Sequence, residues 1–205
     1  MRREALLVAA ALLLVSAAPV HAESKNWFSF NGGYAMPKGP FKDRGKNGIA
    51  FEADLRHMLM PQFGVGGSIA YADFQAADGI NASVESVYGP GSTLVFTNWS
   101  YTAFLIGAVP VGRVTTYGRW GWGVYNPKLQ IRSPLYGLGD KTGHDYGYIA
   151  GGGVNVKITS QLGLGVDGTW HGYEDSFWDF NMSWWNARVS ILYQVPGIND
   201  ALQAR

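Results

Sequence analysis

The stretch GIAFEADLRHML, residues 48–59, decides the fold that this sequence predicts. Ile49, Phe51 and Leu55 alternate with Glu52 and the charged residues that follow it. Successive side chains of a β-strand point to opposite faces. The stretch therefore predicts a strand with one apolar face and one charged face.

The same alternation recurs along the chain and predicts eight strands, at 26–36, 48–59, 63–74, 94–109, 115–126, 145–158, 162–173 and 183–195. Long polar segments rich in Gly, Pro and aromatic residues connect some of them, at 37–47, 75–93, 127–144 and 174–182. Short connections separate the others, at 60–62, 110–114 and 159–161. Alternating long and short connections are typical of transmembrane β-barrels, whose long loops lie outside the cell.

The first 22 residues have the pattern of a cleaved export signal. Arg2 and Arg3 precede the apolar run of residues 5–15, and Val20-His21-Ala22 forms a small-x-small cleavage site. The expected mature chain divides into a barrel at 23–195 and a short tail at 196–205. After the signal, no apolar stretch approaches the roughly 20 residues of a membrane helix.

Composition limits the class of protein further. The 205 residues include 28 Gly and no Cys, and only 15% are charged, against about 25% in soluble domains. Residues 1–22 contain two Arg and one Glu, so 14 of the 16 basic and 14 of the 15 acidic residues remain after cleavage. A chain without net charge is not expected to bind nucleic acid electrostatically.

Alternation alone does not say which face points inward, and a soluble barrel would bury the apolar face. The polar face favours the membrane interpretation, because it has few charges and many Gly, Asn, Ser and Thr residues where a water-exposed face would have more Lys and Glu. Aromatic residues of the apolar face also gather near strand ends, as in interfacial girdles. They are Phe28, Phe63, Tyr71, Trp99, Tyr146, Trp170, Trp185 and Tyr193.

The chain resembles the eight-stranded outer-membrane β-barrels of the OmpA/OmpX/OmpW type. The resemblance covers most of residues 26–195 and rests on WFSFNGGY at 27–34, FGVGGSIAY at 63–71, YIAGGGVNV at 148–156, LGLGVDGTW at 162–170 and ARVSILY at 187–193. It implies an all-β, antiparallel up-and-down barrel in the outer membrane. It also implies outer-membrane lipids, lipopolysaccharide and the barrel-insertion machinery as partners.

One feature departs from that group, whose members usually end on an aromatic residue that the insertion machinery recognises. Here the chain continues from Tyr193 into the tail at 196–205. The tail is too short for a peptidoglycan-binding domain, so that role of some OmpA-type proteins is not transferred.

Charged residues of the polar face are expected to meet inside the barrel. An eight-stranded barrel has room inside for side chains only, and a buried ion costs several kcal/mol unless it is paired. We therefore predict a lumenal network of ion pairs formed by Glu52, Asp54, Arg56, Arg119, Lys157, Asp167 and Arg188. Such a network either plugs the barrel or lines a gated path, and the small strand number favours the plug.

Aromatic residues in the long connections are candidate contacts for a ligand or partner, because exposed apolar clusters mark interaction surfaces. They are Tyr136, Phe177, Trp178 and Phe180. The alternative is that they pack on one another.

The sequence favours a non-enzymatic protein without cofactor or metal, with a structural or interaction role in the envelope. The runner-up is a small pore or a lateral-diffusion transporter for small hydrophobic molecules. Catalysis is less favoured because His57 has no Ser near it on its face, and His171, near Glu174 and Asp175, belongs to no recognisable motif.

Overall fold

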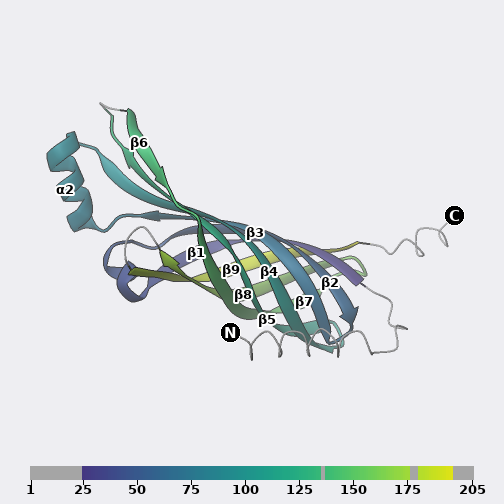
Figure 1. Ribbon diagram of the computed structural model, residues 1–205. Coiled ribbons are helices and arrows are strands. Elements are labelled where there is room, and N and C mark those ends of the chain that lie inside the picture. The colour runs from purple at the N-terminus through teal and green to yellow at the C-terminus, as the bar shows by residue number, and fades with distance from the viewer. Residues whose placement is uncertain (1–24, 135–136, 176–179, 196–205) are drawn as a thin grey trace, which may run out of the picture.

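Eight antiparallel strands form a closed barrel in the computed structural model, which describes residues 25–134, 137–175 and 180–195 (Figure 1). The barrel strands are β1 (Lys25–Lys38), β2 (Gly48–Met60), β3 (Phe63–Gln75), β4 (Thr93–Val111), β5 (Val114–Arg132), β7 (Asp145–Lys157), β8 (Leu162–Asp175) and β9 (Phe180–Val195). Each strand pairs with the preceding and following barrel strand, and β1 pairs with β9. The up-and-down topology predicted from the sequence is confirmed.

The hydrogen-bonded ladder is continuous around the barrel. The closing pair of strands runs from Asn26 opposite Val195 to Lys38 opposite Ser183. Among the eight barrel pairings, the register shifts only between Met58 and Met60, where β2 meets β3. Because closure pairs the backbone of both outermost strands, the barrel leaves no open edge in a membrane.

The two faces of the wall have the predicted orientation. On β2, Phe51 and Leu55 are 43% and 53% exposed, whereas Glu52 and Asp54 are each 1% exposed. Exposed large apolar side chains continue around the outside of the other strands, including Phe30, Trp120 and Val189. A closed barrel with an apolar outer belt and a polar interior is a transmembrane barrel. The soluble alternative, with the apolar face inside, is wrong.

Two long connections contain regular structure that the sequence analysis missed. Residues 127–144 were expected to form a loop, but β5 continues to Arg132 and pairs there with β6 (Gly137–Thr142). Residues 75–93 contain α2 (Asp78–Tyr88). Figure 1 shows both elements projecting beyond the same end of the barrel.

Each missed element has a local cause. Proline usually interrupts a strand, but Pro127 lies opposite Asn98 within the β4–β5 ladder. The alternation of apolar and polar residues resumes after it. In α2, Ile80 and Val84 are one helical turn apart and pack against the buried core. No described helix is long and apolar enough to cross a bilayer.

The first long connection folds back over the barrel. It contains the short 3-10 helix η1 (Gly39–Asp43), with Pro40 in its first turn. Phe41 of η1 is fully buried and contacts the rings of Phe74 and Phe96 at centroid distances of 5.0 and 5.6 Å. The connection therefore places an apolar side chain inside the outer mouth of the barrel.

Candidate functional site: the barrel lumen

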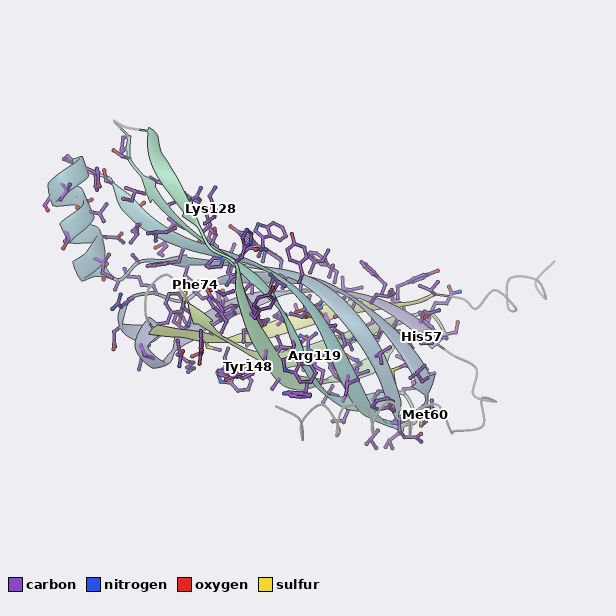
Figure 2. The ribbon with its side chains drawn as sticks, in the orientation of Figure 1. His57, Met60, Phe74, Arg119, Lys128 and Tyr148 are labelled. Atoms are coloured by element: carbon purple, nitrogen blue, oxygen red, sulfur yellow. The ribbon has the colours of Figure 1, made fainter. Side chains whose placement is uncertain are left out.

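The lumen contains three successive layers of side chains. Figure 2 places Phe74 toward the end that bears α2, Arg119 near the middle, and Met60 toward the end with the short turns. The long connections define the outer end, and the short turns define the periplasmic end. The layers differ in chemistry.

The middle layer is an ionic cluster formed by Glu52, Asp54, Arg56, Arg119, Asp167 and Arg188. Glu52 lies at its centre and accepts hydrogen bonds from two arginines of other strands. Arg119 approaches it with Nη1 2.6 Å from Oε1 and Nη2 3.2 Å from Oε2. Arg188 Nη1 donates to Oε2 at 2.8 Å. The two contacts of Arg119 form the bidentate geometry that makes guanidinium–carboxylate pairs strong.

A second carboxylate binds the other side of Arg188. Asp167 Oδ1 accepts from Arg188 Nε at 3.0 Å and from Nη2 at 2.6 Å. Thr169 Oγ1 accepts from Arg119 Nη2 at 2.7 Å and from Arg188 Nη2 at 2.9 Å. The hydroxyl thus joins the two arginines from the β8 side.

The remaining pair of the ionic cluster lies nearer the periplasmic end. Arg56 donates from Nε to Asp54 Oδ1 at 2.6 Å and from Nη2 to Oδ2 at 3.1 Å. Ser29 Oγ and Asn31 Nδ2 donate to the same Oδ2, and the Arg56 guanidinium lies 4.5 Å from the ring centroid of Tyr117. The Asp54 carboxylate is therefore bound by groups from β1 and β2.

The charges of the ionic cluster balance. Three carboxylates face three guanidinium groups, and all six residues are buried, with Asp167 the most exposed at 7%. Buried charges of this kind are tolerated when they are paired and hydrogen-bonded. The middle of the lumen is consequently filled by a neutral set of side chains that hydrogen bonds link across the barrel.

The structure brings six of the seven predicted lumenal residues together and separates the seventh. Lys157 faces inward near the periplasmic mouth, where its Nζ lies 5.3 Å from the ring centroid of Trp27. No ion pair involves Lys157 in the described part of the chain. Lys157 therefore lies apart from the ionic cluster, because alternation predicts a face of the wall and not a depth along it.

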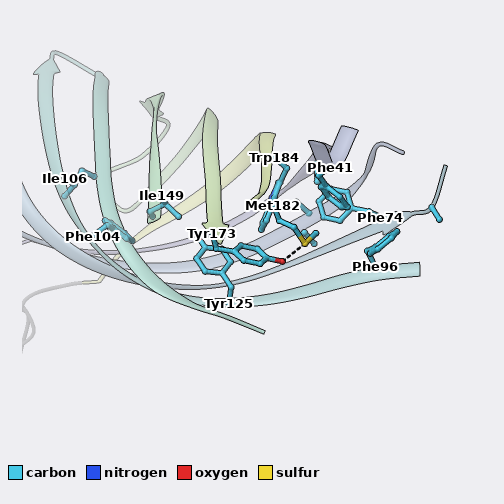
Figure 3. Close-up of a cluster of buried hydrophobic side chains, with 14 of the residues drawn as sticks. Phe41, Phe74, Phe96, Phe104, Ile106, Tyr125, Ile149, Tyr173, Met182 and Trp184 are labelled. Carbon is cyan, nitrogen blue, oxygen red and sulfur yellow. Dashed lines mark hydrogen bonds between the residues drawn. The ribbon is translucent and has the colours of Figure 1, made fainter. Parts of the chain in front are cut away.

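The outer layer contains buried aromatic side chains, which belong to a larger cluster of buried apolar residues (Figure 3). Trp184 stacks on His171 with ring centroids 4.8 Å apart and planes within 2°. Tyr125 stacks on Tyr173 at 4.9 Å, and Phe74 contacts Trp184 at 5.7 Å. Together with Phe41 from the first connection, these rings close the lumen above the ionic cluster.

The histidines considered for catalysis have packing partners. His171 is buried, with Nδ1 3.2 Å from the Tyr125 hydroxyl and Nε2 3.0 Å from Asn186 Nδ2. His57 Nδ1 lies 2.7 Å from Asn26 Oδ1. Within the described residues, His, Cys, Asp and Glu form no group of three or more that could hold a metal ion.

The predicted loop contacts fall almost entirely outside the described residues. Tyr136, Phe177 and Trp178 lie there, and Phe180 begins β9. Their role as ligand contacts therefore stays a prediction.

Thr169 and Tyr117 are two of the lumenal partners of arginine that the sequence analysis did not name. Thr169 shares the inward face with Asp167, and Tyr117 shares it with Arg119, so alternation could have identified both. Only hydroxyl chemistry distinguishes them as partners of arginine, since neither is charged.

The periplasmic layer contains a cavity of about 270 Å³. Most of its wall is apolar and includes Met58 and Met60 of β2, Ile106 of β4 and Leu192 of β9. Arg56 and Tyr117 lie at its inner end, where it meets the ionic cluster. The ionic cluster therefore bounds this space on its inner side.

The sequence matches no family model and no curated protein. The structure is similar to Neisserial surface protein A, with a TM-score of 0.61 and 10% identity over 82% of this chain and 96% of that chain. It is similar to Ail of Yersinia pestis in complex with the heparin analogue sucrose octasulfate, with a TM-score of 0.55 and 17% identity over 84% and 99%. It is also similar to a major outer membrane protein of Thermus thermophilus, with a TM-score of 0.55 and 14% identity over 84% of this chain and 100% of that chain.

At identities this low, the similarity shows that the fold is shared and says nothing about activity. The fold is that of the eight-stranded outer-membrane β-barrels, as the sequence predicted. The apolar outer belt and closed ladder of this chain agree with a position in the outer membrane.

Proposed function

We propose that this chain is a non-enzymatic envelope protein that acts through its wall and its external elements, and that its lumen does not conduct. The observation that supports this proposal is the blocked interior. The ionic cluster fills the middle of the lumen, and the aromatic layer with Phe41 fills the outer end. An interior of eight strands is just wide enough for such side chains.

The external elements are the parts that would contact a partner. The outer ends of β4 and β5 extend past the barrel with β6, and α2 lies beside them (Figure 1). Ail, the attachment invasion locus protein of Yersinia pestis, shares this fold and forms a complex with a heparin analogue. That likeness supports an interaction role, and it extends to this chain no further than the class of role.

The runner-up, lateral passage of hydrophobic molecules through the wall, lacks a supporting observation. Such a route needs a gap between strands, whereas all eight barrel pairings are continuous in the described residues. The apolar cavity opens at the periplasmic end and not beneath the long connections. We therefore keep the closed, structural role as the single proposal.

Planar-bilayer recordings test the blocked lumen. The wild-type barrel is expected to give no stable conductance steps. A variant that combines Glu52→Ala, Arg119→Ala and Arg188→Ala removes the central side chains and is expected to conduct if it folds. Lys42→Ala, at an exposed position in η1, is the matched control and should stay silent. Large, stable channels from the wild-type protein would contradict the proposal.

A further inference from the structure

The periplasmic cavity has the lining of a site for an acyl chain. Met58 and Met60 of β2, Ile106 and Ala108 of β4, and Leu192 of β9 all line it. Methionine side chains are flexible and adapt to different apolar shapes. Ligand sites are typically concave and largely apolar, with a small number of polar groups that orient the ligand.

The size of the cavity limits the ligand to a short chain. A cavity of about 150 Å³ lined by apolar residues takes up benzene, which has six carbon atoms. The volume here is about 270 Å³. The same ratio of volume to carbon gives room for roughly ten carbon atoms. A medium-length acyl chain fits, and a full phospholipid does not.

The charge of the mouth points to an anionic head group. Lys157 lines the cavity beside Trp27 and has no acidic partner in the described chain, whereas the charge of Arg56 is compensated by Asp54. Three of the segments around this mouth, 57–65, 106–117 and 153–164, contain no acidic residue. An ammonium at the rim of an apolar cavity is a favourable partner for a carboxylate.

We propose that the periplasmic end of the lumen binds a medium-chain fatty acid. The acyl chain enters the apolar cavity, and the carboxylate remains at the mouth, where it accepts hydrogen bonds from Lys157 Nζ. This site goes beyond the proposed structural role and does not require a conducting lumen, because the ionic cluster closes the cavity on its inner side.

Methyl NMR of the barrel in lipid nanodiscs, with ¹³C-methyl methionine and decanoate as the probe, tests the site. Met58 and Met60 line the cavity, whereas Met36 and Met182 do not and serve as internal controls. Decanoate is expected to shift the Met58 and Met60 signals saturably and to leave the other two unchanged. Absent shifts, or equal shifts at all four methyl groups, would overturn the proposal, since the second result reports partition into the bilayer.

Two variants test the charge and the space separately. Lys157→Gln is expected to weaken decanoate binding about tenfold, as loss of a hydrogen bond to a charged group predicts. Lys46→Gln, on an exposed lysine near the outer end, is the matched control and should bind normally. Ala108→Leu fills part of the cavity and should also weaken binding. Unchanged affinity in Lys157→Gln, or equal affinity of wild type for decanol, refutes the role of the carboxylate.

Discussion

Glu52→Gln is expected to destabilise the barrel strongly, because it removes the central charge of the ionic cluster. The Glu52 carboxylate is fully buried and accepts three hydrogen bonds, from Arg119 and Arg188. After the substitution, two carboxylates remain for three guanidinium groups. Loss of one partner from a buried ion pair typically costs about 3–5 kcal/mol, because the other charge stays uncompensated.

Urea titration of the barrel in lipid vesicles, followed by tryptophan fluorescence, measures this change. If the unfolding free energy falls with urea concentration at an unchanged slope, a lower midpoint concentration of urea means a lower free energy of unfolding in water. Asp78→Asn is the matched control, since Asp78 pairs with Lys46 at the surface. Exposed pairs of that kind contribute only about 0–1 kcal/mol. The control should therefore unfold at nearly the wild-type midpoint.

A double variant separates charge imbalance from general disruption. Glu52→Gln with Arg119→Met leaves Arg56 paired with Asp54 and Arg188 paired with Asp167, so the lumen is neutral again. Contacting residues show coupling energies of about 0.5–3 kcal/mol. The double variant should accordingly lose less stability than the sum of the single variants. If Glu52→Gln unfolds within about 1 kcal/mol of wild type, the cluster is not a desolvated ionic core, and the reasoning fails.

Two further predictions concern the wall. A Cβ at Gly121 would lie 2.1 Å from the Ala103 carbonyl oxygen, whereas at Gly118 the nearest atom is 3.8 Å away. Gly121→Ala should lower the free energy of unfolding in urea by about 1–3 kcal/mol or more, and Gly118→Ala by less than about 0.5 kcal/mol. Equal unfolding midpoints for the two variants would contradict this interpretation of the packing. A spin label at Val189, which is exposed on the outer belt, should contact acyl chains, whereas one at the buried Ser190 should not. Water accessibility at Val189, measured by paramagnetic relaxation, would oppose the membrane assignment.

The strands and their inward faces were predictable because a period of two is a local property of the chain. Residues 48–59 showed both faces within twelve positions, and the structure forms β2 over Gly48–Met60. Alternation alone did not show which face points into the barrel. The small number of charged residues on the polar face was needed to infer that this face points inward. By contrast, residues 128–132 alternate as regularly as a strand, but they belong to a segment that was expected to form a loop because it is polar and rich in Gly, Pro and aromatic residues.

The pairing inside the lumen could not be predicted from the same pattern. Glu52 and Arg188 are 136 residues apart and lie on strands that are not neighbours. Their contact depends on the stagger of the strands, which sets the depth of each inward residue along the axis. Periodicity contains no information about that stagger. Lys157 shows the consequence, since it has the predicted inward face but lies at the mouth instead of in the middle.

Depth also divides the lumen into regions with different roles. Ionic pairing can be completed only where acids and arginines meet at one level, and here that level is the middle of the barrel. Above it, aromatic rings fill much of the space, and below it the apolar wall leaves a cavity beside Lys157, which has no ion-pair partner in the described chain. A lumen that served only to fill the barrel would need no such asymmetry. The closed middle and outer layers support the structural proposal, and the open periplasmic layer is where a small ligand has room to bind.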